Sequence, residues 1–141
     1  MFLFHTSPKE ITKIDRSGKF DDCLFFATTP YSMSVGAVIT YRIDAAEMDF
    51  INASGLYDED IVVEIAKRFN VEIEVAESLL DGSDSVWNYD FADADEDWYL
   101  QAKRGECAKK MGYDGCKDED EQGGVYIIPM LGRESILNKE F

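Results

Sequence analysis

The run Gly123-Gly124-Val125-Tyr126-Ile127-Ile128-Pro129, near the C-terminal end, is rich in β-branched and aromatic residues. It predicts a strand that follows a glycine turn, and Pro129 places it at a sheet edge or at a strand end. Similar runs predict strands at Met1–His5, Cys23–Thr28 and Val35–Ile43. The sheet structure therefore draws its strands from both ends of the chain.

The middle of the sequence predicts helices instead. Asp58 can cap a helix in which Ile61, Ile65 and Phe69 recur every four positions. Asn70 can cap a second helix, which ends at Asp81-Gly82.

A third helix is predicted from about Asp93 to Met111, because its first turn is acidic and its last turns are basic. The predicted fold class is therefore α+β, and 141 residues are enough for one domain with a core of its own.

Charge is distributed unevenly along the chain. The sequence has 14 Lys+Arg and 29 Asp+Glu, so its net charge is 14 − 29 = −15. Residues 43–97 contain only two basic residues, Lys67 and Arg68, against seventeen acidic ones, and thus hold the whole excess. This charge argues against a protein that grips nucleic acid by its phosphates, and it fits a partner with a basic surface.

Several other classes are disfavoured by composition. No stretch approaches the roughly 18 apolar residues of a membrane span, and the first residues lack the pattern of a secretory signal. Cys23, Cys107 and Cys116 form no C-x-x-C pair, so we expect reduced, buried thiols and a cytoplasmic protein. A single histidine, His5, argues against a His-based zinc site, and we expect no metal.

Three short segments could carry chemistry, and each also has a structural interpretation. His5-Thr6-Ser7 is either a strand end with turn-forming residues or a ligand-binding edge. The segment Phe25–Tyr31 supplies aromatic side chains for a core or for a cleft. The acidic run Asp118–Gln122 is either a solvated loop or a source of carboxylates that stabilise an oxocarbenium ion.

Taken in order, these segments resemble the ADP-ribosyltransferase family of the His–Tyr–acid type, whose split sheet draws strands from both ends of the chain. More narrowly, Phe4–Pro8, Tyr41–Ile43, Asp120–Gly123 and Met130–Gly132 resemble phage anti-CRISPR ADP-ribosyltransferases. The resemblance implies a split antiparallel sheet in a single domain, residues 1–141, with an acidic helical insertion at about 44–97.

The resemblance also implies roles for individual residues. His5 would contact the adenosine-side ribose of NAD, and Thr6, where many relatives have glycine, would hold the nicotinamide carboxamide. Tyr31 would stack on the nicotinamide, with Phe26 lining the same cleft. The remaining implied residues are Asp120 as the catalytic carboxylate, with Glu121 as its rival, and Ser7 and Ala27 in the same NAD-binding edges.

The function that this resemblance implies is an anti-CRISPR mono-ADP-ribosyltransferase. It would use NAD to modify the DNA-recognition subunit of the type I-F CRISPR surveillance complex in the cytoplasm of the host bacterium, and so block target DNA binding. Two alternatives remain open: a non-catalytic acidic DNA mimic that occupies a basic groove, and a toxin-type ADP-ribosyltransferase with another protein target.

Overall fold

The computed structural model describes residues 2–7, 11, 23–28, 39–120 and 123–139 of the chain. Within them, four strands come first, three α-helices follow, and three strands come last, which is the α+β organisation that the sequence predicts. The strands are β1 (Phe2–Ser7), β2 (Cys23–Phe26), β3 (Ile39–Asp44), β4 (Phe50–Asn52), β5 (Gly115–Asp120), β6 (Gly123–Pro129) and β7 (Asn138–Lys139). The helices are α1 (Glu59–Phe69), α2 (Ile73–Asp81) and α3 (Ala94–Lys110), with short 3-10 turns η1 (Ala53–Gly55), η2 (Val86–Asn88) and η3 (Glu134–Ile136).

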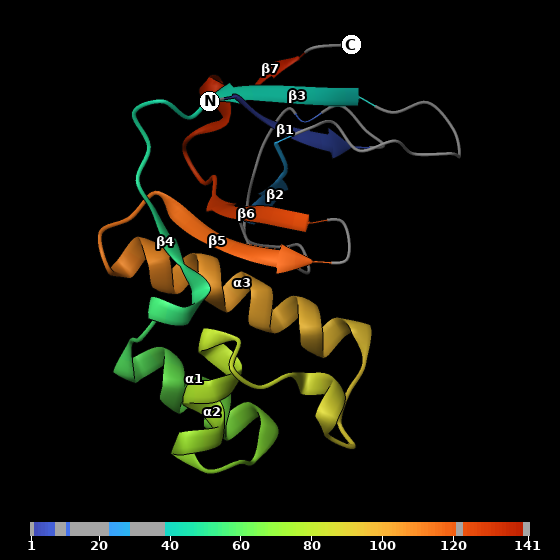
Figure 1. The fold of residues 1–141 in the computed structure, drawn as a ribbon, viewed down its shortest axis with the longest axis vertical. Coiled ribbons are helices and arrows are strands. Elements are labelled where there is room, and N and C mark those ends of the chain that lie inside the picture. The colour runs from blue at the N-terminus through green and yellow to red at the C-terminus, as the bar shows by residue number, and fades with distance from the viewer. Residues whose placement is uncertain (1, 8–10, 12–22, 29–38, 121–122, 140–141) are drawn as a thin grey trace.

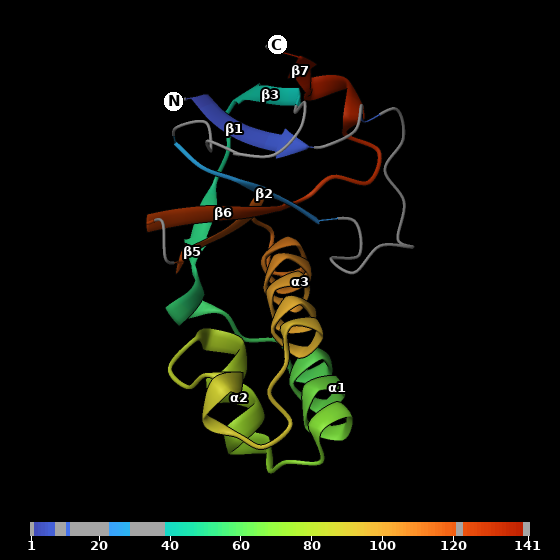
Figure 2. The same ribbon diagram turned by 90° about the vertical axis from the view of Figure 1, so that its right-hand side faces the viewer.

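The strands form two sheets, one of order β1-β3-β7 and one of order β2-β6-β5-β4. Figures 1 and 2 show four successive layers: the first sheet, the second sheet, α3, and then α1 with α2. Both ends of the chain contribute to each sheet, as predicted. The strand that contains Val125–Ile128 lies between β2 and β5, and Pro129 is its last residue.

One strand pair departs from the predicted antiparallel arrangement. β4 runs parallel to β5, with Phe50 opposite Gly115 and Asn52 opposite Lys117, whereas the other described pairs are antiparallel. Parallel neighbours need a long crossover connection. Here the crossover is the helical segment between β4 and β5, which includes α1, α2 and α3. Residues 44–97 thus supply a strand as well as acidic helices, and their status as an insertion in one domain remains a proposal.

Two apolar cores fill the spaces between these layers. The first lies between the helices and the second sheet and includes Ile65, Leu79, Leu100 and Ile127, all at most 1% exposed. The second lies between the two sheets and is built from Leu3, Phe26, Ile43, Ala45, Tyr126, Ile128 and Met130. Alternate residues of β6 therefore enter different cores, as the period of two in a strand requires.

The helix ends confirm most of the predicted signals. The Asp58 side chain accepts a hydrogen bond from Ile61 N, and Asp93 caps α3 in the same way. Gly82 ends α2 with φ = 81°, as the sequence predicts. The prediction for Asn70 is wrong: it adopts the left-handed conformation as the C-cap of α1, and α2 begins after Glu72. Asparagine tolerates this conformation better than other non-glycine residues, and therefore a start signal and a stop signal are easily confused there.

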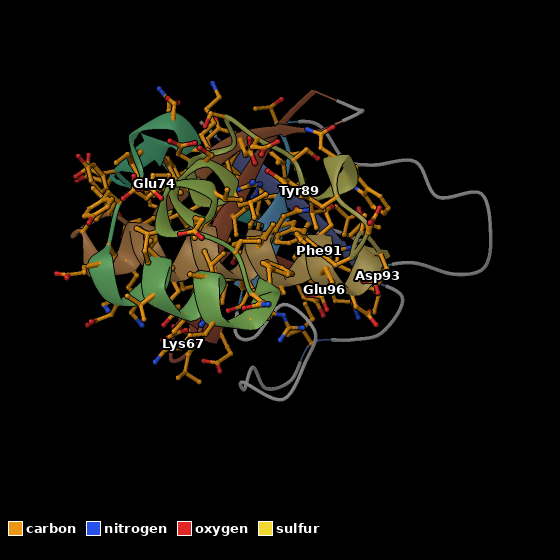
Figure 3. The ribbon with its side chains drawn as sticks, turned by 90° about the horizontal axis from the view of Figure 1, so that it is seen from below. Lys67, Glu74, Tyr89, Phe91, Asp93 and Glu96 are labelled. Atoms are coloured by element: carbon orange, nitrogen blue, oxygen red, sulfur yellow. The ribbon has the colours of Figure 1, made fainter. Side chains whose placement is uncertain are left out.

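Aromatic stacking joins α1 to the segment that leads into α3. Phe69 stacks on Phe91 with ring centroids 4.6 Å apart, and Phe91 stacks on Tyr89 at 5.1 Å. Figure 3 shows this face from below, with Lys67 on α1 and Glu74 on α2. The acidic helices are therefore attached to the body by apolar contacts as well as by charge.

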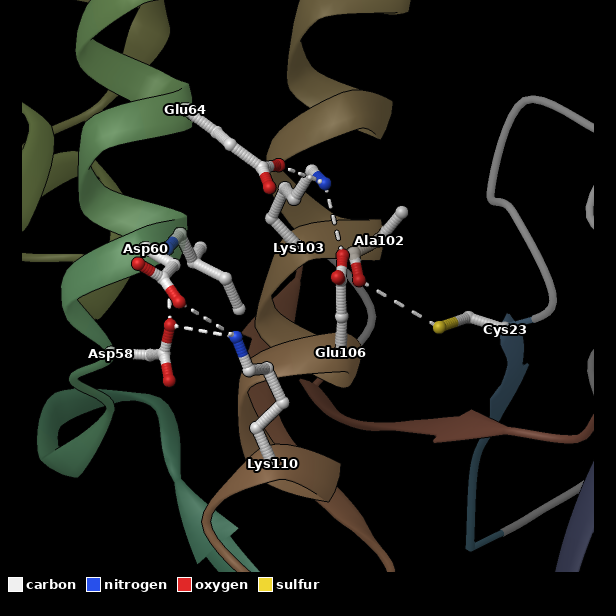
Figure 4. A network of polar contacts seen from close by, with 9 residues as sticks. Cys23, Asp58, Asp60, Glu64, Ala102, Lys103, Glu106 and Lys110 are labelled. Atoms are coloured by element: carbon white, nitrogen blue, oxygen red, sulfur yellow. Dashed lines mark hydrogen bonds and ion pairs between the residues drawn. The ribbon is translucent and has the colours of Figure 1, made fainter.

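Ion pairs fix α1 against α3 (Figure 4). Lys103 Nζ lies 2.6 Å from Glu64 and 2.9 Å from Glu106, and Lys110 Nζ lies 3.1 Å from Asp58. Burial lowers the pKa of Lys103, but its hydrogen bonds to the two carboxylates outweigh burial, so the net shift is upward. Part of the negative charge of residues 43–97 is thus neutralised by ion pairs with lysines of α3.

The three cysteines are buried free thiols, as expected. Burial raises the pKa of Cys107 to about 11 and that of Cys116 to about 12, so both are protonated at neutral pH. Within the described residues, no helix combines the length and the apolar character that crossing a membrane requires.

Gly105 allows α3 to approach the second sheet closely, which generates a test of this packing. A Cβ atom at this position would lie 2.6 Å from Cys23 Sγ and 3.0 Å from Ile127 Cγ2. We expect Gly105→Ala to lower the free energy of unfolding by about 1–3 kcal/mol in urea titrations, although alanine favours helix by about 1 kcal/mol. Adding Cys23→Ala should restore part of the loss, and a Gly105→Ala protein more stable than wild type would contradict this packing.

Candidate NAD-binding and catalytic site

A single backbone bridge joins β1 to β2. Phe4 N donates to Ala27 O at 2.8 Å, and Ala27 N donates to Phe4 O at 2.9 Å. Because β1 belongs to the first sheet and β2 to the second, this bridge brings the end of β1 against the other sheet. It therefore brings the segment that contains His5 and Thr6 close to Phe25, Phe26 and Ala27.

His5 is half-buried and held in one orientation. Its Nδ1 lies 2.8 Å from the carbonyl oxygen of Phe25, which can only accept, so Nδ1 carries the proton. The ring also contacts Phe26, with centroids 5.6 Å apart. Burial lowers the pKa of His5, and the hydrogen bond to Phe25 offsets only part of that shift. The imidazole is thus neutral at pH 7, and Nε2 is a hydrogen-bond acceptor.

Thr6 carries an unsatisfied polar atom. Its hydroxyl oxygen is buried and has no hydrogen-bond partner within the part of the chain that the structure describes. An unsatisfied buried hydroxyl costs about 1–3 kcal/mol. Such a group, on the strand that also carries the fixed His5 imidazole, fits a site that a polar ligand completes. Ser7 follows as a buried residue at the end of β1.

Phe26 and Ala27 are more buried than residues that line an open cleft. Phe26 has no exposed surface and belongs to the core between the sheets, and Ala27 is 6% exposed. Phe25 packs against the other core, since neighbouring strand residues face opposite sides. Phe26 therefore supports the His5 ring from the core instead of forming an open wall.

The first three residues of the acidic run, Asp118–Asp120, belong to a strand. β5 continues through Asp118 and Glu119 to Asp120, whose backbone lies opposite Gly123 of β6. Gly124 lies opposite Glu119 in the same pairing. Glu121 and Tyr31 lie outside the described residues.

The structure also reveals an ion pair that the sequence interpretation missed. Arg104 of α3 is 8% exposed, and its NH1 lies 2.8 Å from Asp118 Oδ2. Its other nitrogens donate to the carbonyl oxygens of Leu80 at 3.0 Å and Leu79 at 2.9 Å. The available signal was helical spacing: Arg104 lies four residues from both Leu100 and Ala108, which places it on the buried stripe of α3.

Two cavities flank Asp118. One, of about 300 Å³, lies between α3, β5, β6 and the segment after α2, with Arg104, Gln101 and Val125 among its lining residues. The other, of about 340 Å³, is lined by Asn52, Ser54, Lys117 and Asp118. The end of β5 thus lies beside hollow space on the helix side of the second sheet.

Two bridged sheets, with a fixed histidine on β1 and an acidic strand end on β5, agree with the ADP-ribosyltransferase class that the sequence resemblance implies. The chain belongs to the anti-CRISPR type I-F ADP-ribosyltransferase AcrIF11 family, whose model matches residues 1–136. It is accordingly an enzyme, an NAD-dependent protein mono-ADP-ribosyltransferase. This assignment confirms the resemblance identified in the sequence, and it sets aside the non-catalytic DNA mimic.

Comparison with solved structures agrees with the family. A crystal structure of an anti-CRISPR protein is similar to this chain with a TM-score of 0.60 and 28% sequence identity, covering 91% of this chain and 88% of the other. No curated protein sequence matches the chain. The family implies NAD as co-substrate and a target within the type I-F complex.

The environment of His5 generates a direct titration test. Because His5 is the only histidine, its imidazole resonances need no assignment by mutation. We expect their NMR titration midpoint to lie below the ordinary value of 6.5, since burial disfavours the charged ring. A midpoint at or above 6.5 would contradict the neutral, Nδ1-protonated ring.

Proposed function

We propose that this enzyme transfers ADP-ribose from NAD to the DNA-recognition subunit of the type I-F surveillance complex and thereby blocks target DNA binding. The NAD-binding half is supported by two successive residues of β1: His5, whose neutral imidazole is held in one orientation, and Thr6, whose buried hydroxyl has no hydrogen-bond partner among the described residues. The choice of subunit is supported by the sequence resemblance described above.

The two groups have complementary roles in this proposal. His5 Nε2 accepts a hydrogen bond from a hydroxyl of the adenosine-side ribose. Thr6 supplies its hydroxyl and its backbone to the nicotinamide carboxamide, which satisfies the buried oxygen. Ser7 and Ala27 complete the edge, Phe26 supports the imidazole, and Tyr31 stacks on the nicotinamide ring.

The reaction breaks the bond between nicotinamide nitrogen and C1′ of the ribose. Positive charge develops on the ribose as an oxocarbenium ion, and a carboxylate from Asp120 or Glu121 stabilises it and orients a ribose hydroxyl. A nucleophilic atom of the target forms the new bond to C1′, neutral nicotinamide leaves with the bonding electrons, and the acceptor loses its proton. Electrostatic groups placed in this way typically contribute about 10²–10³-fold to kcat.

Thr6→Val tests the binding role with almost no change in shape. The variant removes the unsatisfied oxygen, so the unliganded protein should be as stable as wild type or more stable, by up to about 1–3 kcal/mol. Its NAD affinity, measured by calorimetry, should nevertheless fall. Thr6→Ser, which keeps the hydroxyl, is the matched control. If a folded Thr6→Val protein binds NAD with wild-type affinity, Thr6 is not part of the NAD-binding site.

The catalytic carboxylate is tested by Asp120→Asn and Glu121→Gln, which remove charge and keep shape. One of the two should lower ADP-ribose transfer by about 10²–10³-fold with unchanged thermal stability. We expect the larger loss at Asp120. If Glu121→Gln is inactive and Asp120→Asn is active, Glu121 is the catalytic carboxylate. Two fully active variants would contradict this mechanism.

The acidic helices offer a docking surface for the basic DNA-binding region of such a target. They lie on the far side of α3 from the first sheet (Figures 1 and 2). Many of their carboxylates already interact within the protein. Asp58 and Asp93 cap helices, Glu64 forms an ion pair with Lys103, and Glu96 forms one with Arg68. Among the described residues, three acidic side chains of α2 and its N-cap make neither an ion pair nor a side-chain hydrogen bond: Glu72, Glu74 and Glu77. The fourth, Asp81, accepts a hydrogen bond from Ser83 N.

These three residues make the appropriate test of docking, because none of their side chains makes a capping hydrogen bond or an ion pair that a reversal of charge would break. Glu72→Lys, Glu74→Lys and Glu77→Lys together should slow association with the surveillance complex at about 0.05 M salt, where screening is weak, and much less at about 0.5 M. The matching triple Gln variant should show an intermediate effect, and NAD affinity should be unchanged in both. An unaltered association rate at low salt would exclude this face as the docking surface.

A further inference from the structure

Asp118, the ion-pair partner of Arg104, lies two residues before Asp120 on β5. Arg104 is held on three sides: by Asp118 Oδ2 at 2.8 Å and by the last carbonyl groups of α2, from Leu79 and Leu80. A buried guanidinium with several fixed acceptors has little freedom to move, because each lost contact would leave a desolvated charge. The Asp118 carboxylate is therefore fixed to the helical layer.

The end of β5 needs such a support. β4 pairs with β5 only from Gly115 to Lys117, so from Asp118 onward β6 is its one partner strand among the described residues. Asp118 also lines two cavities, so part of the surface around it is not packed against other side chains. A two-stranded hairpin end without packing support is only marginally stable.

We propose that Arg104 is a positioning residue for catalysis: through Asp118 it anchors the end of β5 and so sets the place of the catalytic carboxylate. This inference rests on the proposed role of Asp120 or Glu121, and it goes further by assigning function to a side chain of α3. The contacts that make up this support run from the C-terminal end of α2, through the Arg104 guanidinium and Asp118, to the β5–β6 hairpin.

The consequence for kinetics is specific. His5 and Thr6 lie on β1 in the other sheet, so loosening the hairpin should leave NAD binding intact. A displacement of about 1 Å in a reacting group can cost about 10²-fold in rate. Loss of the Arg104–Asp118 ion pair, here called the tether, should therefore lower kcat with little change in the KM for NAD.

Asp118→Asn and Arg104→Lys test the tether in the full-length protein, with the purified type I-F surveillance complex and NAD as substrates. Asp118→Asn keeps the shape and removes the charge, and Arg104→Lys keeps the charge and removes the forked geometry. We expect each to lower kcat by about 10²-fold, with an almost unchanged KM for NAD. Ile65→Ala, in the fully buried core of α1, is the control for stability: it should lower the Tm at least as much and leave kcat unchanged below the unfolding transition.

A second readout tests the anchor without catalysis. Amide hydrogen exchange across residues 118–124 should accelerate in Arg104→Lys and remain at the wild-type rate in Ile65→Ala. Unchanged kcat and unchanged exchange in both tether variants would overturn the inference, as would an equal loss of kcat in Ile65→Ala. If the wild-type enzyme transfers nothing to the complex, the proposed target fails, and accelerated exchange still decides whether Arg104 anchors the hairpin.

Discussion

Two hydrogen bonds between the backbones of Phe4 and Ala27 hold the end of β1 against the second sheet, and the candidate site depends on them. They bring the His5 ring within reach of the Phe25 carbonyl group, which in turn selects the tautomer of the imidazole. The apolar core between the sheets excludes water from this junction, so burial keeps the ring neutral. A ligand contact made of one acceptor and one buried hydroxyl follows from this geometry.

The parallel pairing of β4 with β5 is the second constraint. It requires a long crossover, and the chain uses that crossover to carry most of its negative charge on α1, α2 and the start of α3. α3 connects the acidic helices to the second sheet. One side of α3 packs on the sheet that carries the β5–β6 hairpin, and the other side contacts the acidic helices. The acidic helices and the strand end proposed to carry the catalytic carboxylate thus lie on opposite sides of α3.

Much of this arrangement could be predicted from the sequence, and the failures have physical causes. Strong periodicity and caps identified α1 and α3 to within about a residue, and the β-branched run gave β6. The strand β5 was missed because Asp118, Glu119 and Asp120 have low strand propensity, which pairing with β6 overrides. The tether was missed because pairing across 14 residues of sequence depends on how α3 packs on the sheet.

The central claim is that this family member modifies a protein of the type I-F surveillance complex by using NAD. Intact-mass spectrometry of every subunit, after incubation of the purified complex with this protein and NAD, tests that claim most directly. The account predicts a mass increase of one ADP-ribose on the DNA-recognition subunit alone, absent without NAD. Unmodified subunits, or modification confined to another subunit, would contradict it.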